Sequence, residues 1–121
     1  MPRSESPDVH AASATPIRAS FRDSIYRIKV EGRLGESECF ELRHVLAQAE
    51  ASSARRILLD VDRLTSLDAR GLHAILRASR RSAGDGNRLQ VTRGRGHVAD
   101  IFRLSALDQT LQFVDGATPS P

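Results

Sequence analysis

Three carboxylates and two hydroxyls lie within one short stretch of this chain, and their types set the chemistry to consider. Asp60, Asp62 and Asp68 supply oxygen ligands of the kind that Mg²⁺ takes. Thr65 and Ser66 supply hydroxyls that could be phosphorylated. Asp60 and Asp62 are two residues apart on a predicted strand, so both point to one side. The pattern favours structural or capping roles for the aspartates and hydrogen bonding within a loop for the hydroxyls.

The other reactive side chains form no catalytic or metal-ligating pattern. The histidines are His10, His44, His73 and His97. They lack the spacing of metal-ligand pairs, and none stands at a recognisable catalytic distance from the single cysteine, Cys39. Cys39 occupies an apolar position of a predicted helix and is expected to be a small buried side chain. We therefore expect no enzyme activity, no catalytic residue, no metal and no cofactor.

The elements around the aspartates place the start of a helix just beyond the end of a strand. Arg56 to Val61 is an almost continuous aliphatic run, which predicts a strand buried on both faces. A short polar loop is expected next, and then a helix from Asp68 or Ala69 to Ser82, with Asp68 as N-cap. The first free N–H groups of such a helix point outward, where a phosphate or a partner's acidic group can be held. Ala69, just inside the helix, has no hydroxyl.

This predicted helix has an inner and an outer side. Its inner stripe is expected to consist of Leu72, Ile75, Leu76 and Ser79. Arg70, His73 and Arg77 are three and four residues apart and share the exposed face. Gly71 lowers helix propensity, so its presence in the first turn is explained by close packing against a neighbouring backbone or a partner.

The remaining elements surround this strand and helix. A β-hairpin is predicted from 17–21 and 25–30, and Gly32 marks the exit from its second strand. A helix is predicted over 36–52. Its apolar stripe is formed by Cys39, Leu42, Leu46 and Ala49 and widened by Phe40 and Val45. A strand over 88–92, a helix over 97–105 and a strand over 111–114 follow.

The order of elements predicts an α/β fold: one domain with a mixed, mostly parallel sheet, an N-terminal β-hairpin and about three helices. Three helices cover one face of such a sheet and leave the other partly exposed. The domain is expected over 17–115, between flexible tails at 1–16 and 116–121. A chain of 121 residues suffices for one domain of this kind.

Composition indicates where the protein works in the cell and which classes of partner it does not bind. A single cysteine and the absence of a signal peptide or a membrane-spanning run favour the cytoplasm. The net charge of +3 comes mostly from scattered arginines with few aromatics beside them, so we expect neither nucleic-acid binding nor membrane insertion. The oligomeric state is not predicted.

The sequence resembles the STAS domain, which bacterial anti-sigma-factor antagonists and sulphate transporters share. The strongest match is the strand 57–61 followed by 67–72, Leu-Asp-Ala-Arg-Gly-Leu, where the family has an apolar-Asp-Ser-x-Gly-Leu loop before an amphipathic helix. Segments 30–34 and 98–107 resemble the family's early Gly-x-Leu and its late helix. The resemblance covers roughly residues 17 to 115.

The resemblance implies a non-catalytic regulatory module that binds a protein. In the anti-sigma-factor antagonists, the partner is an anti-sigma factor serine kinase, which phosphorylates the serine after the loop Asp and so ends the complex. A phosphate of nearly two negative charges there can repel the partner without unfolding the domain. In this chain Ala69 stands at the phosphosite-equivalent position, and Gly35 stands where many antagonists carry an acidic residue. The usual switch is therefore absent unless Thr65 or Ser66 replaces it.

The predicted partner-binding surface is the loop together with the exposed side of the second helix. Its residues are Thr65, Ser66, Asp68, Ala69, Arg70, Gly71, Leu72, His73 and Arg77. The expected partner is an anti-sigma factor serine kinase or a STAS-binding signalling protein. The alternative is an accessory subunit of a lipid-transport ABC system or a stress-signalling assembly, which small stand-alone STAS proteins also resemble.

Overall fold

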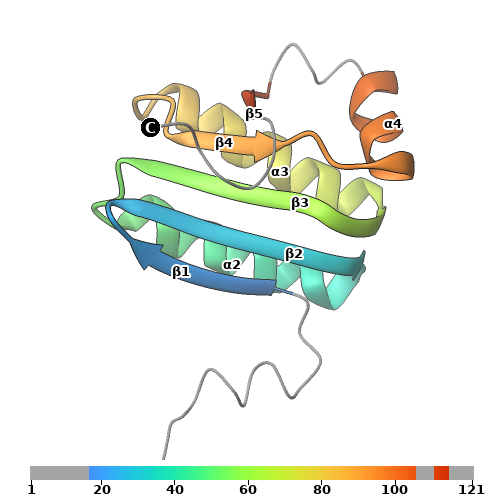
Figure 1. The fold of residues 1–121 in the computed structure, drawn as a ribbon, viewed down its shortest axis with the longest axis horizontal. Helices are drawn as coiled ribbons and strands as arrows, with labels where there is room; N and C mark the ends of the chain where they lie inside the picture. The colour runs from blue at the N-terminus through green and yellow to red at the C-terminus, as the bar shows by residue number, and fades with distance from the viewer. Residues whose placement is uncertain (1–16, 106–110, 115–121) are drawn as a thin grey trace, which may run out of the picture.

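The strands form one five-stranded sheet in the order β1-β2-β3-β4-β5 (Figure 1). The computed structural model describes residues 17–105 and 111–114. Its strands are β1 (Ile17–Arg22), β2 (Ile25–Leu34), β3 (Arg56–Leu67), β4 (Leu89–Thr92) and β5 (Phe113–Val114). β1 pairs with β2 antiparallel, and every other pair is parallel. The predicted mixed sheet with an N-terminal hairpin is confirmed, while the predicted tails at 1–16 and 116–121 lie outside the described residues.

Three described helices connect the parallel strands. They are α2 (Glu36–Ala51), α3 (Ala69–Ala83) and α4 (Gly96–Leu104). Figure 1 shows α2 and α3 side by side behind the sheet, which agrees with their position between neighbouring parallel strands. The predicted succession of two strands, then helix and strand three times, is confirmed.

Two strands are longer than the sequence predicts. β2 continues through Gly32, whose φ of +77° suits glycine, as far as Leu34. β3 continues to Leu67, so the predicted polar loop after Val61 is wrong. The backbone stays extended because β2 and β3 remain paired to their ends, with Leu34 opposite Leu67. At the other end of the chain, β5 comprises only Phe113 and Val114 of the predicted strand over 111–114.

The core lies between the sheet and α2 and α3. Ile28 and Leu59 of the sheet, Leu42 of α2 and Ile75 of α3 are fully buried there. The predicted burial of β3 on both faces is confirmed, because every residue over 57–61 is buried. Phe40 was expected to widen the apolar stripe of α2, but 70% of it is exposed.

The buried stripe of α3 differs in phase from the prediction. It consists of Gly71, Ala74, Ile75, Ala78 and Ser82. Leu72 and Leu76, expected at its centre, are only half-buried. Small residues let α3 approach the sheet closely, and the larger leucines then lie beside the contact instead of inside it.

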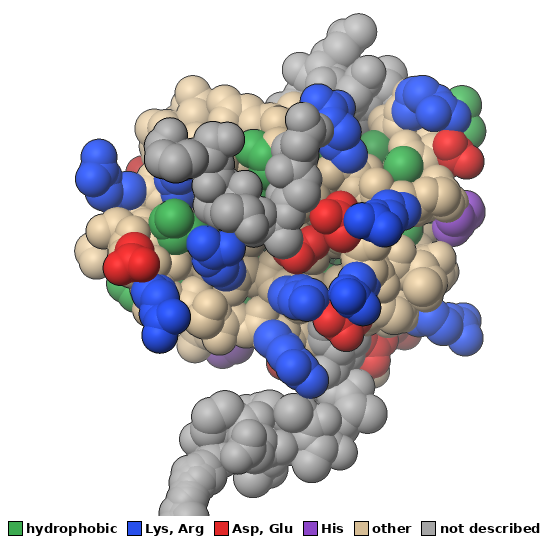
Figure 2. All heavy atoms as spheres, in the orientation of Figure 1, with side chains coloured by type: hydrophobic (Ala, Val, Ile, Leu, Met, Phe, Trp, Pro, Cys, Tyr) green, Lys and Arg blue, Asp and Glu red, His purple; other side chains and the backbone are tan. Residues whose placement is uncertain are grey.

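The opposite face of the sheet is charged. Figure 2, in the orientation of Figure 1, shows many Lys and Arg side chains on this face, with a few acidic side chains among them. Among the described residues, no helix has the length and apolar character needed to cross a membrane.

Candidate functional site

The candidate site lies at the end of the sheet where β2 and β3 stop and α2 and α3 begin; this end is called the edge below. Asp68 is the single residue between β3 and α3, and its Oδ1 accepts a hydrogen bond of 3.0 Å from the N–H of Gly71. The predicted N-cap is therefore confirmed. At the start of α2, the carboxylate of Glu38 accepts a hydrogen bond of 3.0 Å from the N–H of Gly35. Because Leu34 and Leu67 are register partners, the two helices begin side by side.

Gly71 is buried beneath this edge. A Cβ at this position would lie 2.6 Å from Cδ2 of Leu34 and 2.7 Å from Cδ1 of Leu67. Both leucines are themselves buried, so the first turn of α3 rests directly on the ends of β2 and β3. The expected close packing at this glycine is confirmed, but it is against the side chains of two leucines of this chain and not against a neighbouring backbone or a partner. The absence of a side chain at Gly71 thus sets how closely the exposed first turn of α3 lies against β2 and β3.

The predicted exposed face of α3 is present. Arg70, His73 and Arg77 are all exposed, and Ala69 is exposed at the start of the helix. An Nη1 of Arg70 lies 2.9 Å from an Oε1 of Glu36, which joins the first turns of α3 and α2. Both side chains are largely exposed, so this ion pair contributes little to stability. It does bring two opposite charges together where the helices begin.

The hydroxyls of Thr65 and Ser66 do not lie in a loop. Both residues belong to β3, with Thr65 exposed and Ser66 half-buried and paired with Arg33 of β2. Their loop assignment is wrong because the strand extends to Leu67. Backbone pairing holds this segment extended beside β2.

The structure adds a second wall to the site, from α2, that sequence spacing does not reveal. A groove of about 790 Å³ runs between α2 and α3. Its lining residues are Glu36, Ser37, Cys39, Phe40, Arg43, Arg70, His73, Ala74 and Arg77. Phe40 gives the one hint in the sequence, since it is an aromatic residue on the margin of the apolar stripe of α2.

Cys39 lies at the base of this groove. It is buried, as expected. Burial raises the pKa of its thiol, the nearby Arg43 lowers it, Asp68 raises it and Arg70 lowers it, and the net direction is upward. A thiol with a raised pKa is a poor nucleophile at neutral pH.

Asp60 and Asp62 lie close together on β3, and Asp68 lies apart from them. Asp60 is 8% exposed, and its Oδ1 accepts a hydrogen bond of 3.0 Å from the N–H of Asp62. Asp68 lies beyond the end of the strand, eight residues from Asp60. Within 17–105 and 111–114, no three His, Cys, Asp or Glu side chains are grouped closely enough to hold a metal ion.

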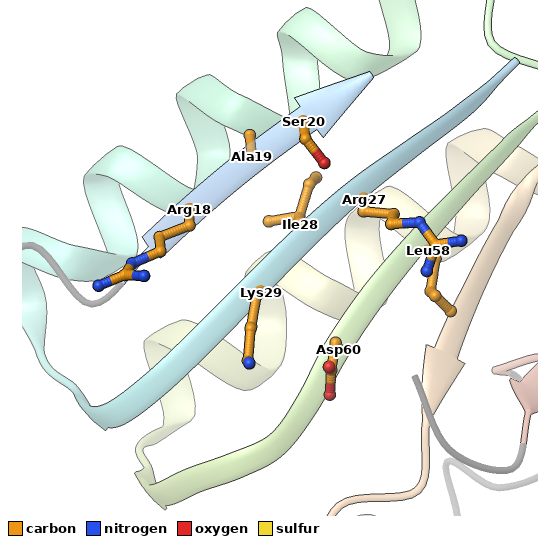
Figure 3. Close-up of a pocket in the computed structure, with 8 residues that line it drawn as sticks. All are labelled: Arg18, Ala19, Ser20, Arg27, Ile28, Lys29, Leu58 and Asp60. Carbon is orange, nitrogen blue, oxygen red and sulfur yellow. The ribbon is translucent and has the colours of Figure 1, made fainter. Parts of the chain in front are cut away.

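A second hollow, of about 310 Å³, lies on the charged face of the sheet (Figure 3). Arg18, Lys29 and Asp60 are neighbours in register across β1, β2 and β3, and Ser20, Arg27 and Leu58 form the next row. Figure 3 shows Arg27 extending over β3 toward Leu58. None of the predicted contact residues lines this hollow, so it is separate from the candidate site.

A family model described as "Mlab, STAS domain" matches residues 17–115 of the sequence. The chain belongs to the STAS-domain family. Solved structures have the same fold as this STAS domain at low sequence identity. The search of curated proteins gives no significant match.

Three solved structures illustrate the likeness of fold. An anti-sigma factor antagonist from Mycobacterium paratuberculosis has a TM-score of 0.72 at 18% identity, covering 83% of this chain and 85% of its own. TM1081 from Thermotoga maritima has a TM-score of 0.73 at 14% identity, covering 83% and 86%. The phosphorylated form of SpoIIAA, a Bacillus cell fate determinant, has a TM-score of 0.65 at 17% identity, covering 81% and 90%.

Proposed function

We propose that this STAS domain is a non-catalytic regulatory module that docks on an anti-sigma factor serine kinase or a related signalling protein. The contact surface is the edge formed by 65–72 and the exposed face of α3. The observation that carries the proposal is the exposure of Arg70, His73 and Arg77 on one face beside the start of α3. Membership of the STAS family supports a regulatory, protein-binding role.

The proposal includes the absence of the usual phosphorylation switch. Ala69 is the first residue of α3 and is exposed, so it occupies an accessible helix start but has no oxygen for a phosphate. Thr65 and Ser66 are held in a paired strand, which makes them poorer substrates for a kinase than a free loop residue. The complex would then be controlled by something other than phosphoryl transfer to this chain.

The test is a direct binding measurement between the purified chain and its candidate kinase. We expect Arg70→Ala and His73→Ala together to weaken binding by about tenfold, because interface charges and aromatic rings contribute on the order of 1 kcal/mol or more. The fold tolerates these changes because both side chains are exposed. Unchanged affinity would remove α3 as the docking face.

Ala69→Ser provides a second test on the same complex. If the partner is a serine kinase docked at this edge, the new hydroxyl lies at the helix start and should become labelled by radioactive ATP. Unmodified wild-type chain is the control. Tight binding without labelling of the serine variant would contradict the kinase as partner.

The alternative is an accessory subunit of a lipid-transport ABC system or a stress-signalling assembly. The matching family model favours keeping this alternative, since its description names Mlab. Binding of the purified chain to a transport ATPase and not to a kinase would establish it, and transporter genes beside the coding sequence would point the same way.

A further inference from the structure

Two ion pairs join α2 and α3, and one of them lies in the groove between these helices. Arg70 of α3 contacts Glu36 of α2 at 2.9 Å inside the groove, and Arg81 of α3 contacts Glu50 of α2 at 3.0 Å beyond it. The two helices therefore run parallel past the whole groove. On α2 the groove is lined from Glu36 to Arg43, which corresponds to about 11 Å of helix.

Beyond the pair of Arg70 and Glu36, the groove is basic. Arg43 projects from α2, and His73 and Arg77 project from α3. In the part of the chain that the structure describes, neither Arg43 nor Arg77 has an acidic partner. The guanidinium of Arg43 lies 5.6 Å from the ring centroid of Phe40. The groove thus pairs its charges where the two helices begin and leaves cations exposed beyond that pair.

An aromatic side chain stands beside these cations. Phe40 is 70% exposed, whereas the floor of the groove is formed by small buried residues, Cys39 and Ala74. Small side chains on the floor allow another backbone to approach closely. An exposed aromatic next to arginines has the composition of an interface hot spot, in which Arg and aromatic residues are enriched.

We propose that this groove binds an acidic amphipathic helix of the partner protein, an inference that rests on the proposed function and names the chemistry of the contact. Carboxylates of that helix pair with Arg43 and Arg77, and its apolar residues pack on Phe40. A groove walled by two parallel helices matches about two turns of a third helix. A strand would need a free sheet edge, which this groove does not provide.

Photo-crosslinking from inside the groove identifies the occupant. A photoreactive phenylalanine analogue replaces Phe40 in the full chain, and in a control it replaces Leu104, which is also an exposed apolar residue (79%) but lies on α4. The adduct formed with the purified partner is digested and sequenced. The expected result is a net-acidic, helix-forming segment at position 40 and no such segment at position 104.

Charge reversal then tests complementarity. We expect Arg43→Glu with Arg77→Glu to lower the affinity by about 100-fold, because like charges facing each other across an interface cost several kcal/mol. Arg55→Glu with Arg95→Glu changes the net charge equally, at exposed residues that lie neither on α3 nor in the groove, and should have little effect. Lys residues in place of the captured acidic residues of the partner should restore binding to the first variant.

The outcomes separate this inference from the proposed function. A partner that binds the wild type and the groove variant equally, or a captured segment that is neutral or basic, overturns the acidic helix and leaves docking intact. An adduct with a second copy of this chain also overturns it. A wild type that binds neither the kinase nor the transport ATPase removes the proposed function, and this inference with it.

Discussion

Gly71 determines how closely the first turn of α3, with its exposed residues, lies against the sheet. The first turn of α3 rests on Leu34 and Leu67 because position 71 has no Cβ. A side chain there would lift the helix start, and with it the exposed residues of the same turn. Helix propensity alone would prefer alanine, so packing outweighs propensity at this position.

We expect Gly71→Ala to lower the free energy of unfolding by about 1 kcal/mol, since overpacking exceeds the gain in helix propensity. Urea denaturation measures the change. Gly84→Ala is the matched control, because a Cβ at that position would lie 3.7 Å from the carbonyl oxygen of Arg81, an ordinary van der Waals contact. Equal stability of the Gly71 variant and the wild type would mean that the two leucines move aside freely.

Cys39 gives a prediction about pH. Its thiol pKa is raised by burial, so the unfolded chain loses this proton at a lower pH than the folded chain. The contribution to stability is complete below the ordinary thiol pKa of about 8.5 and declines as the pH rises toward the raised value. Stability of the wild type should therefore fall more steeply above about pH 8.5 than that of Cys39→Ala. Parallel curves from pH-dependent denaturation would contradict the burial of a neutral thiol.

At the scale of elements, β3 owes its length mainly to β2. β2 pairs with it up to Leu67, while the paired ladder with β4 covers only Ile57 to Leu59. Beyond that ladder, the hydroxyl of Thr92 accepts a hydrogen bond of 2.8 Å from the N–H of Val61. The hydroxyl of Thr92 thus serves as the hydrogen-bond acceptor at a position where β3 and β4 are no longer paired.

Thr92→Val tests this hydrogen bond. The variant leaves the N–H of Val61 buried without its acceptor, so we expect a loss of about 1–3 kcal/mol in the free energy of unfolding. Thr92→Ser keeps the oxygen and should lose less. If the valine variant unfolds at the same urea concentration as the wild type, the hydrogen bond does not stabilise the sheet.

The sequence predicts the succession of elements because apolar periodicity is strong in each of them. It misplaces the ends of β2 and β3, since Thr65 and Ser66 are polar like a loop while their strand is held by pairing with residues more than thirty positions away. The face of Arg70, His73 and Arg77 follows from spacing within one helix. The sequence assigns Phe40 to the buried stripe of α2 and gives Arg43 no role, because only the packing of α2 beside α3 brings the two residues to that face.

At the scale of the whole molecule, the two ends of the helix layer are built differently. The end where the helices start carries the largely exposed pair of Arg70 and Glu36. The other end is held by Arg88, whose guanidinium donates to the carbonyl oxygens of Glu50, Ser52 and Ala54. The start of β4 is thereby tied to the end of α2.

We expect Arg88→Met to lower the free energy of unfolding by about 2 kcal/mol or more, since several hydrogen bonds from a charged donor are lost together. Arg103→Met is the control, because its ion pair with Asp100 is largely exposed and should contribute little. Thermal unfolding compares the two variants. If both variants lower the free energy of unfolding by a similarly small amount, the hydrogen bonds of Arg88 do not stabilise the fold.

The one-residue passage from β3 to α3 has a consequence for any encounter at this edge. Only Asp68 lies between a paired strand and a capped helix, so the backbone has no loop that could change its conformation when a partner binds. Recognition there must rely on a shape that already exists before contact. Binding there costs no backbone conformational entropy at the junction, and the side chains alone decide which partner is selected.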